Sequence, residues 1–390
     1  MAQLGRALRS GRRGRGFESR HADYIFRGAR ISAAPFFNIS PTAGDQGQGI
    51  SLLRWQMLCR HLSVVHFCGI VILSLTEKMG SERIRGMNDL HNRIQQLKKE
   101  KDAVILAHYY VHDEVQQAAD YIGDSFYLSK LATKTGADTI VYCGVSFMGE
   151  SAKILNPEKR VLMPDETADC PMAHMADPDR ITRLREEYED LAVVCYINST
   201  AELKCYADVC VTSSNAVKIV KKLPNKNIFF IPDENLGRYV AEQVPEKNFI
   251  FNDGFCHVHA AVSPEQVAAA KASHPAAKFL AHPECKTDVL ELADFIGSTS
   301  EIIDYAASCE AEEFIIGTEL GVLYELKEKN PGKKFYSAGA ALCCPNMKKI
   351  SLEKIIYVLE TGANEVQVTD ELRNRANVPL NRMLELASQA

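Results

Sequence analysis

The sequence predicts an α/β protein made of three pseudo-symmetric αβα sandwich domains, with parallel sheets arranged around a central axis. The first observation behind this prediction is a segment that occurs three times: VILAHYYVHDEVQQAADYIGDS, VVCYINSTAELKCYADVCVTSS and KFLAHPECKTDVLELADFIGSTS. Each copy begins with an apolar run typical of a buried parallel strand and continues into a polar turn and a helical stretch that ends in Ala-Asp. A second apolar strand follows each copy, and this alternation indicates parallel sheets between layers of helices.

The spacing within the copies is the second observation. The last residue of the first strand precedes the aspartate of the Ala-Asp pair by 12 positions in all three copies: His108 to Asp120, Tyr196 to Asp208 and His282 to Asp294. The second strands, TIVYCGV, NIFFIPD and EFIIGTE, follow at a nearly constant distance. The copies recur after 88 and then 86 residues, which is enough chain for each one to form its own core.

These intervals set the expected domain boundaries. We expect the first domain over residues 87–169, the second over 170–255 and the third over 256–344. Residues 345–390 contain no fourth copy, but they do contain a helical pattern with an apolar face. We expect this segment to complete the first domain and close the ring, because its apolar face would otherwise stay in water.

Residues 1–86 differ in composition from the rest of the chain. They hold 13 basic and 5 acidic side chains, whereas residues 87–390 hold 32 and 45. Their apolar run of 14 residues is too short to cross about 30 Å of hydrocarbon. We expect residues 1–86 to be an extension that forms no domain. Either it is disordered, or the start of the gene has been assigned too far upstream and translation begins at Met79 or Met87.

The composition of the whole chain excludes several classes of protein. Of its 390 residues, 46% are apolar and 24% are charged, and the net charge is −5. This balance excludes a largely disordered protein and a basic nucleic-acid scaffold. Twelve cysteines without a credible secretory signal indicate reduced thiols or metal ligands rather than disulfides. We therefore expect a cytoplasmic protein with neither nucleic-acid nor membrane partners.

Three of the cysteines follow the repeat. Cys170, Cys256 and Cys344 are separated by 86 and 88 residues and lie in loops between or just after the copies. Because equivalent loops of pseudo-symmetric domains meet near the axis, three thiolates are expected to converge. Such a set suits an iron–sulfur cluster or, less favourably, zinc. The alternatives are three unrelated loop thiols, or Cys343 in place of Cys344 as the third ligand.

Three cysteine ligands have a chemical consequence. A 4Fe-4S cluster usually takes four cysteines, so three would leave one iron without a protein ligand. An iron of this kind is a Lewis acid that substrate can reach, whereas a fully ligated cluster is normally an electron carrier.

Polar residues gather at the predicted strand ends and turns. Parallel sheets bind ligands beyond the carboxyl ends of their strands, which here carry His108-Tyr109-Tyr110, Tyr196-Ile197-Asn198 and His282-Pro283-Glu284. Turns with Ser or Thr precede later helical stretches, and they include Ser125, Ser213 and Thr299. These turns are typical of helix N-caps, but several converging helix N-termini would also suit a polyanionic substrate. We expect one pocket that joins these groups to the cysteine loops.

The motifs in this order resemble the quinolinate synthase family, the A proteins of bacterial NAD biosynthesis. The resemblance covers about residues 87–390 through motifs that include AHYY, GVSFMGESAKILNP, CPMA, YINSTAELK, CHVH, AHPEC, GTELG and CPNMKK. It implies three αβα domains around one 4Fe-4S cluster per chain, held by Cys170, Cys256 and Cys344. It also implies condensation of iminoaspartate with dihydroxyacetone phosphate to quinolinate, phosphate and water.

The resemblance further implies roles for individual residues. The dicarboxylate site is expected at His108, at Tyr196, Ile197 and Asn198, at His282, Pro283 and Glu284, and at Thr299. Ser125 and Ser213 match serines that hold carboxylate or phosphate oxygens. The catalytic groups are expected to be Tyr110, Tyr196, His282 and Glu284. A transient contact with an L-aspartate oxidase or aspartate dehydrogenase would supply the iminoaspartate.

Three other functions fit part of the pattern. An electron-transfer protein would need a fourth ligand such as Cys343 or Cys285. A zinc-stabilised structural protein would use the same three thiols, and a hydro-lyase of the aconitase type would use the same open iron on a different acid.

Overall fold

A computed structural model of the protein describes residues 86–340 and 342–389. All of them belong to a single compact unit, Leu73–Ala390. The extension predicted over residues 1–86 therefore lies outside the described residues, apart from residue 86 itself.

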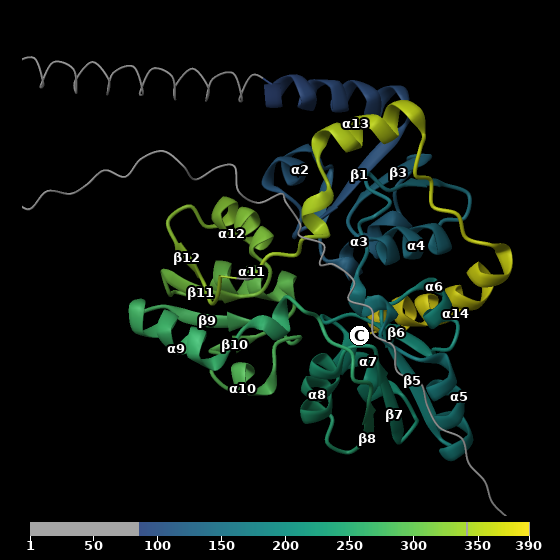
Figure 1. Cartoon of the computed structure of the whole chain (residues 1–390), viewed down its shortest axis with the longest axis vertical. Coiled ribbons are helices and arrows are strands. Elements are labelled where there is room, and N and C mark those ends of the chain that lie inside the picture. Colours follow the sequence, from purple (N-terminus) through teal and green to yellow (C-terminus); the bar gives the residue numbers. More distant parts are fainter. Residues whose placement is uncertain (1–85, 341, 390) are drawn as a thin grey trace, which may run out of the picture. The chain divides into compact units, whose positions relative to one another are not determined.

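The described residues form three parallel sheets of four strands each (Figure 1). The sheets have the orders β2-β1-β3-β4, β6-β5-β7-β8 and β10-β9-β11-β12, so the same topology occurs three times. This arrangement confirms the predicted α/β fold of three repeated αβα units. The strands are β1 (Ala103–His108), β2 (Tyr121–Gly123), β3 (Thr139–Cys143), β4 (Arg160–Leu162), β5 (Leu191–Tyr196), β6 (Val209–Val211), β7 (Asn227–Ile231), β8 (Asn248–Phe251), β9 (Lys278–Ala281), β10 (Phe295–Ile296), β11 (Glu313–Gly317) and β12 (Lys334–Ser337).

The repeated Ala-Asp pairs have a structural explanation. In each unit the aspartate carboxylate accepts a hydrogen bond from a backbone N–H in the first strand, 15 residues earlier. The donor–acceptor pairs are Ile105 N to Asp120 Oδ2 at 2.8 Å, Val193 N to Asp208 Oδ2 at 2.7 Å and Phe279 N to Asp294 Oδ2 at 2.7 Å. The aspartate therefore fixes the start of the short strand that follows it (β2, β6 or β10) against the first strand of its unit.

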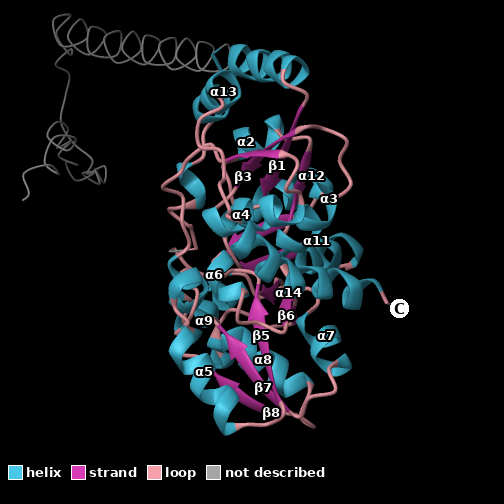
Figure 2. Ribbon diagram, turned by 90° about the vertical axis from the view of Figure 1, so that its right-hand side faces the viewer, coloured by secondary structure: helices cyan, strands magenta, loops and turns pink. Residues whose placement is uncertain are grey.

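Helices cover both faces of the sheets. In the third unit, Phe279 and Ile315 pack with Val267 of α9 and Val289 of α10, whereas neighbouring strand residues pack with α11 and α12 on the opposite face. Figure 2 shows the strands of the other units between helices in the same way. The helices, besides one over residues 86–100, are α2 (Asp113–Ala118), α3 (Ser125–Ala132), α4 (Ser146–Leu155), α5 (Pro178–Glu187), α6 (Ala201–Lys204), α7 (Ala216–Lys222), α8 (Glu234–Gln243), α9 (Pro264–Ser273), α10 (Thr287–Leu290), α11 (Thr299–Ser308), α12 (Leu323–Lys329), α13 (Leu352–Thr361) and α14 (Asp370–Ser388).

The C-terminal segment contacts two of the three units. Helix α13 packs against α2 of the first unit, whereas α14 packs against α6, β6 and α7 of the second unit and α4 of the first. Between these helices, the chain bonds to the edge strand β4, with Val366 N donating to Val161 O at 2.8 Å. The segment thus joins the first and second units to each other.

Among the described residues, the helices are all too short or too polar to span a membrane.

Candidate active site

The strand ends of all three units meet at one cavity of about 780 Å³, part of which is open to solvent. His108 is the last residue of β1, Tyr196 is the last residue of β5, and His282 follows β9 directly. Parallel strands place ligand sites at their carboxyl ends, and here three such ends share one site.

The three predicted cysteine ligands line this cavity together. Each lies just before a short 3-10 turn, namely η1 (Pro171–His174), η2 (His259–Ala261) and η4 (Met347–Lys349). Burial raises the pKa of the Cys170 thiol to about 12, and the negative charges of Glu284 and Cys344 add to this effect. Burial also raises the pKa of Cys256, with Glu284 and Cys170 contributing. Cys343 is exposed and is not among the residues that line the cavity.

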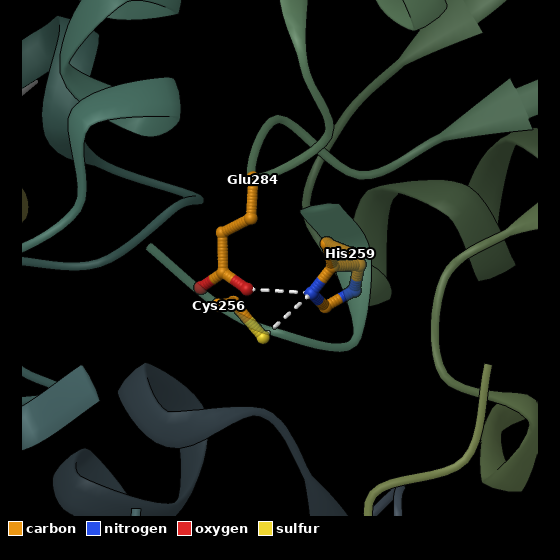
Figure 3. Close-up of side chains that lie close together, drawn as sticks. All are labelled: Cys256, His259 and Glu284. Carbon is orange, nitrogen blue, oxygen red and sulfur yellow. Dashed lines mark hydrogen bonds and ion pairs between the residues drawn. The ribbon is translucent and has the colours of Figure 1, made fainter. Parts of the chain in front are cut away.

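Glu284 lies beside Cys256 and His259 (Figure 3). Its Oε2 atom is 2.6 Å from His259 Nδ1, and the same nitrogen is 3.3 Å from the Cys256 sulfur. Burial disfavours the charged carboxylate, but the close contact with His259 more than offsets this and holds the pKa of Glu284 below its ordinary value. The cavity therefore contains an ionised carboxylate whose hydrogen-bond partner comes from the protein itself.

Tyr110 is joined to Glu284 through a buried chain of hydrogen bonds. Its hydroxyl is 2.6 Å from Thr299 Oγ1 and 2.9 Å from Thr318 Oγ1. Thr318 Oγ1 is in turn 2.9 Å from His259 Nε2. Burial raises the pKa of Tyr110 well above its ordinary value, so the phenol stays protonated.

Two further histidines of the cavity, His108 and His282, are neutral at physiological pH. Burial lowers the pKa of His108 to about 3, and the positive charge of Lys348 favours the neutral form further while Glu284 opposes it. Burial likewise lowers the pKa of His282 to about 3, against the influence of Glu284. His282 Nε2 lies 3.3 Å from Ser213 Oγ. These rings can therefore donate or accept hydrogen bonds, but they do not supply positive charge.

Asn198, which lines this cavity, has an unsatisfied polar atom. Its Oδ1 atom is buried and has no hydrogen-bond partner among the described residues. Because buried polar atoms are almost always paired, such an atom in a cavity wall is typical of a ligand contact.

Most of the predicted site residues come together here. The lining includes His108, Tyr110, Ser125, Cys170, Tyr196, Asn198, Ser213, Cys256, His282, Glu284, Thr299 and Cys344. Two predicted residues are not in the lining: Ile197, whose side chain packs into the hydrophobic core, and Pro283, which is buried. Ser125 and Thr299 are the first residues of α3 and α11, and the residues that cap these helices are the preceding Asp124 and Ser298.

Sequence reasoning missed several residues that the structure places at or beside the cavity. His259 and Glu319 line it, and Thr318 bonds to two lining residues. A signal for His259 was present, because it lies three residues after Cys256 in the CHVH motif. Thr318 and Glu319 are the last two residues of the predicted strand EFIIGTE and directly follow the observed strand β11, where ligand contacts are expected.

Comparisons with known proteins show which family the chain belongs to. A family model described as Quinolinate synthetase A protein matches residues 92–385. The quinolinate synthase of Fusobacterium nucleatum is 57% identical over 298 residues, which are 76% of this chain and 99% of that protein. The quinolinate synthase of Caldicellulosiruptor saccharolyticus is 50% identical over 298 residues, 76% of this chain and 98% of the relative. That of Aquifex aeolicus is 47% identical over 307 residues, 77% of this chain and 95% of the relative.

Proposed function

The chain belongs to the quinolinate synthetase A family, and we propose that it is a quinolinate synthase of NAD biosynthesis. In this proposal it condenses iminoaspartate with dihydroxyacetone phosphate to give quinolinate, phosphate and water. The observation that carries the proposal is that Cys170, Cys256 and Cys344, which follow the last strands of the three units, meet Tyr110 and Glu284 in a single cavity. That combination would supply metal ligands, a proton donor and a base in one partly enclosed space.

The donor set of this cavity suits an iron–sulfur cluster. Cys170, Cys256 and Cys344 would hold it, since soft thiolates select iron–sulfur clusters or zinc. All three thiols have raised pKa values, chiefly because of burial, and a bound cation would favour their thiolate forms. When bound, a cluster held by three cysteines supplies a Lewis-acidic iron to a substrate oxygen.

The neighbouring group of Cys256, His259 and Glu284 has ligand atoms within 4.8 Å of one another. It is a weaker candidate for a metal site, because His259 Nδ1 and Glu284 Oε2 already satisfy each other at 2.6 Å. We therefore assign the His259–Glu284 pair to proton chemistry and not to metal binding.

The proton chemistry follows from the charge states of the residues. Glu284 is ionised and can accept a proton from substrate carbon or nitrogen, whereas Tyr110 is protonated and can donate one. Tyr196 also stays protonated, since burial and the negative charge of the nearby Glu284 raise its pKa. Positioned acids and bases of this kind typically contribute about 10²–10⁴-fold to a rate.

Other residues of the cavity would bind the anionic substrates. The hydroxyls of Ser125 and Thr299 lie at the starts of α3 and α11, where backbone N–H groups favour carboxylate and phosphate oxygens. Asn198 and Ser213 add hydrogen-bonding groups on the second unit. Fixing both reactants beside Glu284 and Tyr110 lowers the entropic cost of the condensation.

The test is an anaerobic assay for quinolinate from iminoaspartate and dihydroxyacetone phosphate, with iron, sulfide and zinc measured in the same sample. We expect wild-type protein to contain iron and sulfide and to form quinolinate. The variants Cys170→Ala, Cys256→Ala and Cys344→Ala should lose both, whereas the matched control Cys343→Ala should keep both. Zinc without sulfide would overturn the cluster assignment, and iron-loaded protein without product would overturn the activity.

A further inference from the structure

Two buried carboxylates occupy equivalent places in the second and third units. Asp233 lies two residues after the end of β7, and Glu319 lies two residues after the end of β11. Both residues are 0% exposed to solvent. They therefore follow the repeat as the cysteines do.

The hydrogen bonds of these carboxylates also correspond. Asp233 Oδ1 accepts from Leu236 N at 2.7 Å, and its Oδ2 accepts from Cys256 N at 3.1 Å. Glu319 Oε2 accepts from Gly321 N at 2.6 Å, and its Oε1 accepts from Cys344 N at 3.0 Å. In each unit one oxygen holds the turn that follows the strand, and the other holds the backbone of the cysteine.

Helix capping alone does not explain why these residues are acidic. A neutral Ser, Thr or Asn caps a helix as well as Asp does, and burying a carboxylate is costly. Glu319 has Lys348 Nζ at 3.2 Å, but Asp233 has no ion-pair partner within the described part of the chain. A carboxylate does, however, offer two acceptor oxygens, which a neutral amide does not. Two acceptors are what these positions require.

The first unit uses a different arrangement. The position two residues after β3 is Val145, and the following Ser146 starts α4 and donates its hydroxyl to Asp169. Asp169 is the neighbour of Cys170 in sequence. The equivalence thus concerns Cys256 and Cys344 only.

We infer that Asp233 and Glu319 are positioning residues, each of which fixes the backbone of one cysteine so that its thiol stays directed into the cavity. The inference rests on the proposed function in taking these thiols as metal ligands. It assigns each carboxylate to one cysteine: Asp233 to Cys256, and Glu319 to Cys344.

Asp233→Asn and Glu319→Gln test this assignment. An amide in either place keeps one acceptor oxygen and turns a donor toward the second N–H, so one of the two bonds is lost. The matched control is Asp177→Asn, because Asp177 caps α5 by accepting from Asp179 N at 2.9 Å and bonds to no cysteine. All four proteins are prepared anaerobically with their metal and exposed to iodoacetamide, and each cysteine is followed by peptide mass spectrometry while iron release to a chelator is recorded.

We expect Asp233→Asn to speed labelling of Cys256 about tenfold, the effect of losing one hydrogen bond of ordinary strength, and to leave Cys344 at the wild-type rate. Glu319→Gln should do the reverse. These labelling rates are compared before iron release becomes measurable, and over longer times both variants should release iron faster than Asp177→Asn. Equal labelling of all three cysteines, or wild-type labelling throughout, would overturn the inference. Should Asp233→Asn fail to fold, Glu319→Gln decides the same claim at Cys344. Wild-type protein without iron would count against the proposed function alone, since the labelling pattern still compares each cysteine with its carboxylate.

Discussion

His259 Nδ1 lies 2.6 Å from Glu284 Oε2, and neither side chain is more than 3% exposed. The opposite ring nitrogen, Nε2, lies 2.9 Å from the hydroxyl of Thr318, which is itself 2.9 Å from that of Tyr110. His259 and Thr318 therefore connect the base of the proposed reaction to its proton donor without an intervening gap.

The first prediction concerns the cost of breaking the buried His259–Glu284 pair. His259→Leu removes the donor and leaves a buried carboxylate without its partner, a change that costs about 3–5 kcal/mol in other proteins. His259→Asn places an amide N–H near the position of Nδ1, so we expect it to cost about half as much. Anaerobic urea unfolding of both variants measures the difference in the free energy of unfolding. Equal losses in the two variants would contradict the importance of this contact.

The second prediction concerns Thr318, which touches both Tyr110 and His259. Thr318→Val keeps the shape of the side chain and removes its hydroxyl, so we expect kcat to fall about tenfold with KM unchanged. Thr318→Ser restores the hydroxyl and should stay within about twofold of wild type.

A double-mutant cycle shows whether this effect passes through the phenol of Tyr110. In a Tyr110→Phe background the bond between the two hydroxyls is already absent, so Thr318→Val should cause little further loss. A full tenfold loss in that background would show that Thr318 acts elsewhere.

Much of the fold could be predicted because the strands are apolar and the repeat is regular. The spacing of His108, Tyr196 and His282 from their aspartates placed three strand ends in register, and parallel topology then brings such ends to the ligand-binding edge. The cysteines could be found by the same period. Residues that the structure requires in every unit recur every 86 to 88 residues, so a single sequence is enough to identify them.

The contacts between the units could not be predicted in this way. Thr318 forms hydrogen bonds with Tyr110, 208 residues away in the sequence, and with His259, 59 residues away. Neither separation matches the repeat, so the sequence does not predict these bonds. Nor does a strand end reveal which of its side chains faces the cavity. Asn198 lines the cavity, whereas the neighbouring Ile197 packs into the core, and both residues lie in the bend that follows β5.

The third prediction concerns the aspartates of the Ala-Asp pairs. Asp120, Asp208 and Asp294 each accept a hydrogen bond from the first strand of their unit, and each also pairs with a partly exposed Lys or Arg. Substitution by Asn keeps one acceptor, so we expect a loss of about 1–2 kcal/mol in each unit. Urea unfolding measures it, and an unchanged iron content would show that the effect is on stability. A loss in one unit only would contradict their equivalence.

The fourth prediction concerns acid stability and His108. The pKa of this ring is lowered by burial to about 3 in the folded chain, against about 6.5 in an unfolded one. Between these values the unfolded state binds more protons, so the contribution of His108 to stability is fully present above pH 6.5 and is lost as the pH falls toward 3.

His108→Asn removes the titrating ring and keeps an oxygen that can accept from Tyr110 N, as His108 Nδ1 does at 3.2 Å. From pH 7 to 5.5 we expect wild type to lose about 1 kcal/mol more than this variant, measured by urea unfolding in parallel. Since all other titrating groups are shared by the two proteins, parallel curves would mean that His108 is not held neutral by burial.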